Sequence, residues 1–165
     1  MGLFSFIKNA GAKVFGIGKT DAEEAAEAAA AAAELKAKAA ASAARKLEET
    51  ISDLDLQVEG LCVNIENDVA TISGLAYDQA TREKAILVVG NSNGIATVDD
   101  RMTVEHVEPE AQFHTVVSGD TLGKIAKKFY GDAMKYPVVF EANKPMLEHP
   151  DKIYPGQVLR IPALD

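Results

Sequence analysis

Cysteine, tryptophan and histidine are scarce in this sequence. Its 165 residues include one cysteine, Cys62, no tryptophan and three histidines, His106, His114 and His149. A single cysteine excludes an internal disulfide and is typical of a reducing compartment; we expect it to be a packed strand residue, not a nucleophile. The histidines show neither a zinc-ligand spacing nor a nucleophile motif with serine or cysteine. We therefore predict that the protein is not an enzyme.

Long apolar runs are also missing. No stretch approaches the roughly 20 residues of a membrane-spanning helix. The apolar start at 1–7 is followed at once by Lys8 and Asn9, which leaves it too short for the core of a secretory signal. We expect a cytoplasmic monomer without stable membrane insertion.

Positive charge is in short supply. The chain has 17 Lys and Arg residues against 25 Asp and Glu, a net charge of −8 at pH 7. The acidic excess lies in residues 1–112, with 19 acidic and 10 basic side chains, whereas residues 113–165 have 6 acidic and 7 basic ones. Neither part offers the basic surface that binds nucleic acid.

Two helical segments are predicted before position 44. Between 2 and 15, apolar residues recur at the three- and four-residue spacing of a short amphipathic helix. They are Leu3, Phe4, Ile7, Ala10 and Val14. From 16 to 43 the chain is rich in alanine, the strongest helix former, with Glu early and Lys or Arg late, as the helix dipole favours. Because its small side chains bury little, we expect this segment to be a mobile helical spacer.

Residues 44–107 are predicted to form a helix, two strands, a second helix and a third strand. Two runs of alternating apolar residues flank a turn at 67–68, which is typical of a hairpin. In the second helix, 78–89, the apolar periodicity places Glu83 on the outer face. In the third strand we expect Asp99–Asp100 to lie on a solvated edge, because neighbouring strand residues point to opposite faces and cannot readily share a metal ion.

A linker at 108–112 leads to a second unit at 113–165. Its predicted elements are a strand from 113, a helix ended by Gly131, a helix over 133–143, and a turn with a closing strand over 153–162. Asp120 is the expected N-cap of the first helix. Pro137 is compatible with the second helix only if it lies in the first turn.

These two units resemble two known domain families. The element order and the segment GNSNGIATVDDRMTVE resemble the BON domain. The segments TVVSGDTLGKIAKKFYGD, FEANKP and IYPGQVLRIP fall in the order and at the spacing of a LysM domain. The resemblance implies an α+β protein with a BON domain (αββαβ) at 44–107 and a LysM domain (βααβ) at 113–165. The helix at 1–15, the spacer at 16–43 and the linker at 108–112 complete the chain.

The loop after the second BON-like helix is a candidate cation site. Gly90 and Gly94 bracket three polar residues, and glycine adopts positive φ without steric penalty. The last carbonyls of a helix lack an intrahelical partner, so several main-chain oxygens can gather there without a carboxylate. Divalent metals prefer carboxylates, whereas neutral carbonyls suit a weakly hydrated monovalent cation. A plain helix-to-strand turn is the alternative.

A BON domain joined to a LysM domain resembles a family of bacterial cytoplasmic potassium-binding proteins. The resemblance implies a K+ sensor whose main-chain oxygens ligate the ion and whose two domains close on each other. The candidate ligands are the carbonyls of Ile7, Ala10, Gly90, Ser92, Gly94 and Ile95. The first two are included because a helix that ends near Gly11 would leave the carbonyls of 7–10 unpaired.

LysM domains usually bind N-acetylglucosamine polymers, and this resemblance implies an alternative function. Their groove lies between the loop after the first strand and the loop before the last strand. The corresponding residues are Gly119, Asp120, Thr121, Leu122, Ile153, Tyr154 and Pro155. In that case the protein would be an envelope adaptor that binds peptidoglycan. The same residue types also serve as turns and caps, so a purely structural role, or a scaffold without a ligand, stays open.

Overall fold

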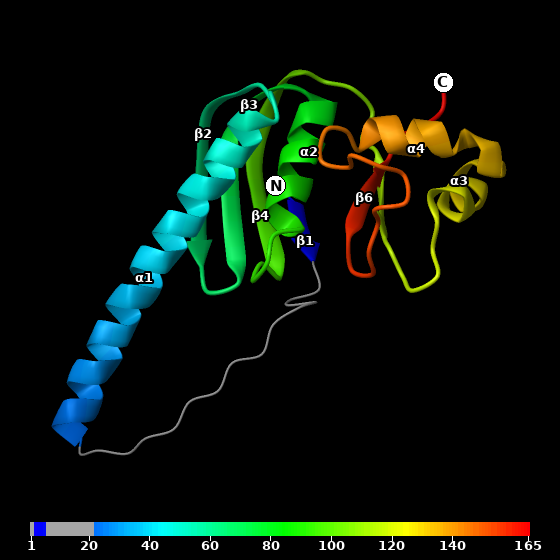
Figure 1. Cartoon of the computed structure of the whole chain (residues 1–165). Coiled ribbons are helices and arrows are strands. Elements are labelled where there is room, and N and C mark those ends of the chain that lie inside the picture. Colours follow the sequence, from blue (N-terminus) through cyan, green and yellow to red (C-terminus); the bar gives the residue numbers. More distant parts are fainter. Residues whose placement is uncertain (1, 6–21) are drawn as a thin grey trace.

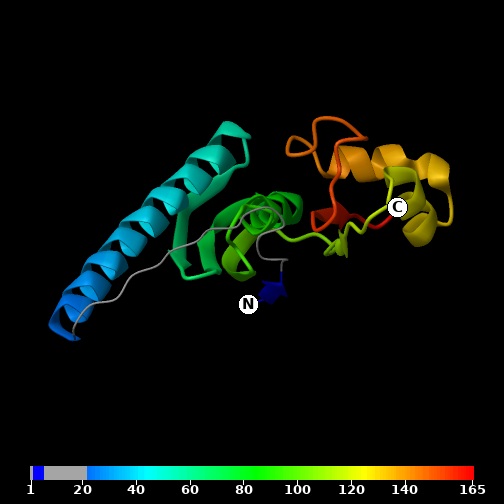
Figure 2. The same ribbon diagram turned by 60° about the horizontal axis from the view of Figure 1, so that its bottom comes forward.

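Two bodies lie next to each other in the structure, a computed structural model that describes residues 2–5 and 22–165 (Figure 1). One consists of a four-stranded sheet with helices α1 and α2, and the other of a two-stranded sheet with helices α3 and α4. A view turned by 60° shows the same division (Figure 2). The α+β class and the two units predicted from the sequence are therefore confirmed.

The larger body follows the predicted order of helix, hairpin, helix and strand, with one strand added. Its elements are β1 (Gly2–Ser5), α1 (Ala22–Asp53), β2 (Val58–Glu66), β3 (Val69–Asp78), α2 (Gln79–Gly90) and β4 (Thr97–His106). The strand order is β1-β4-β3-β2, and β3 and β4 are parallel. Parallel neighbours need a crossover connection, which α2 and the loop after it provide.

The core of this body lies between the sheet and the helices. Its most buried side chains come from α1, α2, β3 and β4. They include Ile51, Ile72, Ala85, Ile86, Val89 and Val98, each no more than 1% exposed. In β3, Ala70 and Ile72 are buried, while Thr71 and Ser73, which alternate with them, are half-buried. This alternation is the expected result of a strand that presents one face to the core.

The alanine-rich part of α1 extends beyond the sheet (Figure 1). Every residue from 28 to 43 is exposed except the half-buried Ala40, which agrees with the small area that alanine can bury. A side-chain contact from Lys36 Nζ to Asn67 Oδ1, 2.8 Å long, joins this part to the turn between β2 and β3. The helix continues through position 44 without a break. Within residues 2–5 and 22–165, no helix combines the length and apolar character needed to cross a bilayer.

The helix predicted over 1–15 is wrong where the structure describes it. Gly2–Ser5 is a strand that pairs antiparallel with the edge of β4, Phe4 opposite Val98. Leu3 is 77% exposed whereas Phe4 packs on the core, so the two apolar residues point to opposite faces, as strand neighbours do. A four-residue segment carries too little pattern to separate this alternation from a helical spacing. Positions 6–21 of the predicted helix and spacer lie outside the described residues.

Two further expectations about exposure are corrected. Asp100 is fully buried and not on a solvated edge. Its Oδ2 pairs with Arg82 Nη2 at 2.6 Å, and its Oδ1 accepts a hydrogen bond from the Met102 amide at 2.9 Å. Strand β4 is flanked by β1 and β3, which removes the edge on which the expectation rested. Cys62, on β2, is exposed and not packed.

The smaller body has the predicted order of strand, helix, helix and strand. Its elements are β5 (Gln112–Thr115), α3 (Leu122–Tyr130), the 3-10 turn η1 (Ala133–Lys135), α4 (Tyr136–Ala142) and β6 (Val158–Ile161). Thr121, not Asp120, is the N-cap of α3, and its hydroxyl accepts from the Lys124 amide. Gly131 ends the helix in the left-handed region with φ +75°, where glycine is favoured. Pro137 lies in the first turn of α4, as the sequence requires.

Candidate metal site at the domain interface

The glycine-bracketed loop is a tightly bonded helix-to-strand turn. Helix α2 ends at Gly90, and the Asn91 amide donates to the Leu87 carbonyl at 2.9 Å. The Ser92 hydroxyl donates to the Val88 carbonyl at 2.7 Å. Gly94 adopts φ +87°, a conformation that favours glycine. Local hydrogen bonds therefore hold this loop against the end of the helix.

The main-chain oxygens of this loop are neutral candidate ligands for a metal ion. The Ser92 carbonyl accepts only a long hydrogen bond, 3.4 Å from the Ile95 amide. Among the described residues, no donor reaches the carbonyls of Gly90 or Gly94. The part of the chain that the structure describes also contains no group of three or more His, Cys, Asp or Glu residues able to hold a metal. Neutral carbonyls without carboxylates suit an alkali ion better than a divalent one.

The two remaining candidate ligands are not placed by the structure. Ile7 and Ala10 lie outside the described residues. The strand β1 that precedes them is paired to β4, with Ser5 opposite Thr97. Thr97 is the first residue of β4 and lies two positions after the loop. The last residue of β1 therefore lies at the same end of the sheet as the loop.

A residue that the sequence did not single out joins this loop to the other body. The Asn91 side chain donates from Nδ2 to the Val158 carbonyl at 2.9 Å and accepts at Oδ1 from the Val158 amide at 2.8 Å. Two positions along β6, Asn143 does the same to the backbone of Arg160, at 2.8 and 2.7 Å. The outer edge of β6 is thus occupied by two asparagine amides, one from each domain.

A buried ion pair forms a second connection between the bodies. Glu83 of α2 pairs through Oε2 with Nε of Arg160 at 2.5 Å. Its Oε1 accepts from Gln79 Nε2 and from the Ala111 amide of the linker, both at 2.9 Å. Glu83 is 2% exposed, so the expectation that it faces solvent is wrong. The reason is that the outer face of α2 is covered by the second domain, which the helical period of one domain cannot reveal.

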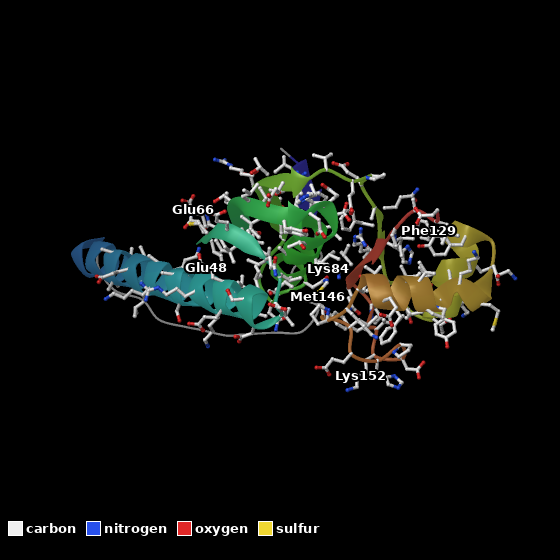
Figure 3. All side chains as sticks on the ribbon, turned by 90° about the horizontal axis from the view of Figure 1, so that it is seen from above. Glu48, Glu66, Lys84, Phe129, Met146 and Lys152 are labelled. Atoms are coloured by element: carbon white, nitrogen blue, oxygen red, sulfur yellow. The ribbon has the colours of Figure 1, made fainter. Side chains whose placement is uncertain are left out.

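A cleft of about 450 Å³ lies between the domains, beside the loop. Leu54 just after α1, Val88 of α2 and Ser92 of the loop line one side, and Met146 and Tyr154 line the other. Figure 3 shows Met146 at this junction. Partial burial raises the pKa of the otherwise exposed Tyr154 above its ordinary value, because an apolar environment disfavours the charged phenolate.

The predicted glycan residues are brought together, but several have structural roles. Val116 joins the two segments, since its amide donates to the Gln157 carbonyl and its carbonyl accepts from the Gly156 amide, both at 2.8 Å. Asp120 turns inward: its Oδ2 lies 2.8 Å from His114 Nε2 and accepts from the Val117 amide at 3.1 Å. The other positions divide by exposure, with Gly119, Thr121, Tyr154 and Pro155 exposed, Ile153 half-buried and Leu122 buried.

Comparison with known proteins identifies both domains. The BON domain family matches residues 37–106, and the LysM domain family matches residues 114–162. The chain is 40% identical over 165 residues to the potassium binding protein Kbp of Escherichia coli, with 98% of this chain and 99% of that protein covered.

Two further relatives match over shorter lengths. An uncharacterised protein of Deinococcus radiodurans is 49% identical over 50 residues, which cover 30% of this chain and 19% of that protein. Esterase Rv1288 of Mycobacterium tuberculosis is 35% identical over 92 residues, which cover 55% of this chain and 20% of the esterase. The Kbp match spans both domains end to end, and the chain therefore belongs to the Kbp family of BON–LysM proteins.

Proposed function

We propose that this protein binds K+ through main-chain oxygens of the loop after α2. The candidate ligands are the carbonyls of Gly90, Ser92, Gly94 and Ile95, completed by those of Ile7 and Ala10. The observation that carries the proposal is that this loop offers carbonyls of Gly90 and Gly94 without a hydrogen-bond donor from the described residues and contains no carboxylate. The potassium binding of the Escherichia coli relative, stated in its name, supports the same ion.

We further propose that ion binding favours the closed arrangement of the two domains. The loop that would hold the ion also holds β6 through Asn91. A ligand shifts a conformational equilibrium only by its differential affinity for the two states. If the carbonyl ligands are better ordered when the loop is bonded to β6, the closed arrangement has the higher affinity for K+. The protein then acts as a K+ sensor.

The remaining properties belong to the same proposal. A sensor of this kind needs no catalytic group, and we propose a non-enzymatic, cytoplasmic monomer that does not bind nucleic acid. The net charge of −8 supports the last point, because nucleic-acid affinity depends on basic side chains that neutralise phosphates.

A glycan-binding adaptor is the second candidate. The exposed Gly119 and Tyr154 favour it, since a sugar reader uses accessible backbone groups and aromatic edges. The inward-turned Asp120 and the buried Leu122 weigh against it, because their side chains are already engaged by the domain itself.

Calorimetric titration with K+ and with Na+, beside a peptidoglycan pull-down, tests the two functions. The sensor predicts binding heat with K+ but not with Na+, a smaller radius of gyration by X-ray scattering in K+, and no retention on peptidoglycan. Retention on peptidoglycan together with no response to K+ would replace the sensor by the adaptor. No response to either would leave a scaffold.

A further inference from the structure

We infer that Asn91 is a positioning residue of the ion site, so that the LysM strand β6 sets part of the affinity for K+. The inference rests on the proposed function and adds a named residue to it. Asn91 lies between Gly90 and Ser92, two of the candidate ligands, while its side chain is bonded to another domain. Its task is to hold the loop, not to touch the ion.

The backbone of Asn91 does not require an asparagine. It adopts φ −79° and ψ −1°, which lies in the ordinary right-handed region open to most residues. The chain therefore has no conformational reason for asparagine here, in contrast to the left-handed positions where Asn is enriched. What distinguishes asparagine at this position is its side-chain amide, which supplies one donor and one acceptor in a single plane.

That side-chain amide makes the hydrogen bonds to β6 that a neighbouring strand would otherwise make. Its two hydrogen bonds, 2.9 and 2.8 Å long, pair both backbone groups of Val158. Asn143 performs the equivalent task for Arg160 from within the LysM domain. The edge of β6 is therefore completed only when the BON loop is in place, because an unpaired strand edge presents free amide and carbonyl groups.

The same contact restrains the loop. The Asn91 amide is fixed on Leu87 at 2.9 Å, and its side chain is fixed on Val158, so the residue is held at two points. The peptide group before Asn91 contains the Gly90 carbonyl. The peptide group after Asn91 connects it to Ser92, whose carbonyl is the next candidate ligand. Loss of the side-chain anchor frees these peptide groups to turn, and a cage of neutral oxygens loses the geometry on which its affinity depends. By linkage, an ion that is bound in the cage must strengthen the contact with Val158 to the same extent.

A matched pair of asparagine variants tests this role. Asn91→Ala removes both hydrogen bonds, and Asn91→Leu removes them while it keeps most of the side-chain volume. Asn93→Ala makes the same chemical change two positions away, at an exposed residue that is not a candidate ligand. Calorimetry should show K+ affinity lowered at least about fivefold in both Asn91 variants, the lower end of usual coupling between sites, and changed less than about twofold in Asn93→Ala.

Amide hydrogen exchange gives a readout that a loss of general stability does not imitate. In the wild-type protein, K+ should slow exchange of the Val158 amide more than that of the Arg160 amide, which is bonded within its own domain. In Asn91→Leu the K+ effect on Val158 should vanish. Unchanged K+ affinity in both folded Asn91 variants, or equal K+ effects on Val158 and Arg160, would overturn the inference. Failure of the wild-type protein to bind K+ would instead overturn the proposed function.

Discussion

Glu83 and Arg160 form an ion pair across the boundary between the two domains, with side chains 3% and 11% exposed. Helix α2 carries the carboxylate and strand β6 carries the guanidinium. Both oxygens of Glu83 are used, because the linker amide of Ala111 and the Gln79 side chain bond to the second oxygen. The described residues contain no buried side-chain polar atom without a hydrogen-bond partner. The domains are therefore joined by a complete polar network.

Removal of one partner of this pair should destabilise the protein strongly. Glu83→Gln leaves the Arg160 guanidinium buried without a counter-charge, which costs about 3–5 kcal/mol in comparable buried pairs. The free energy of unfolding in urea measures the loss. Glu34→Gln is the matched control, since its partner Lys38 forms an exposed i,i+4 pair on α1 and such pairs contribute only about 0.3–0.5 kcal/mol. Equal losses in the two variants would show that the domain boundary is solvated.

Two glycines with nearly the same positive φ separate ion binding from stability. Gly94 has φ +87° and Gly119 has φ +86°, and an added Cβ meets no atom within 4 Å at either position. Alanine should therefore destabilise the folded state by about 1–2 kcal/mol at each, through the left-handed backbone alone. We expect Gly94→Ala to weaken K+ binding as well, because the Gly94 carbonyl is a candidate ligand, and Gly119→Ala to leave it unchanged. Calorimetry and urea unfolding of both variants check this; equal K+ affinities would remove Gly94 from the site.

The His114–Asp120 contact predicts an acid-sensitive LysM domain. The hydrogen bond from His114, with that from the Val117 amide, holds the pKa of Asp120 below its ordinary value of 3.8. A carboxyl whose pKa is lower in the folded state stabilises the protein above the unfolded value and loses this contribution as the pH falls through the folded one. As the pH drops below about 4, the free energy of unfolding should therefore decrease. In Asp120→Asn the free energy of unfolding should depend less on pH in this range. The control is Asp151→Asn, which removes a 91% exposed carboxylate from the same domain. An identical acid response in wild type and Asp120→Asn would contradict the prediction.

Much of the fold could be predicted because its signals are local. The alternation in β2 and β3, the alanine-rich helix and the left-handed Gly131 each depend on residues close in sequence. The strand β1 could not be predicted in this way. Its four residues pair with β4 almost 100 positions later, and a segment so short fits a helical or an alternating spacing equally well.

The interface was hidden from the sequence for a related reason. Glu83 lies at a polar position of an amphipathic helix, and only the second domain turns that position into a buried one. Asn91 looked like one polar residue among three in a glycine-bracketed loop. Its distinction from Asn93 is a partner 67 positions away, Val158, and no spacing rule for a single chain relates two such residues.

A crystal structure with Rb+ in place of K+ tests the central claim most directly, because the anomalous signal of Rb+ locates the ion independently of the protein. We predict one strong peak at the end of α2, in contact with the main-chain oxygens of Gly90, Ser92, Gly94 and Ile95 and with no carboxylate. An ion held elsewhere by side-chain carboxylates, or a loop without a peak in crystals of protein that binds K+ in solution, would contradict the account.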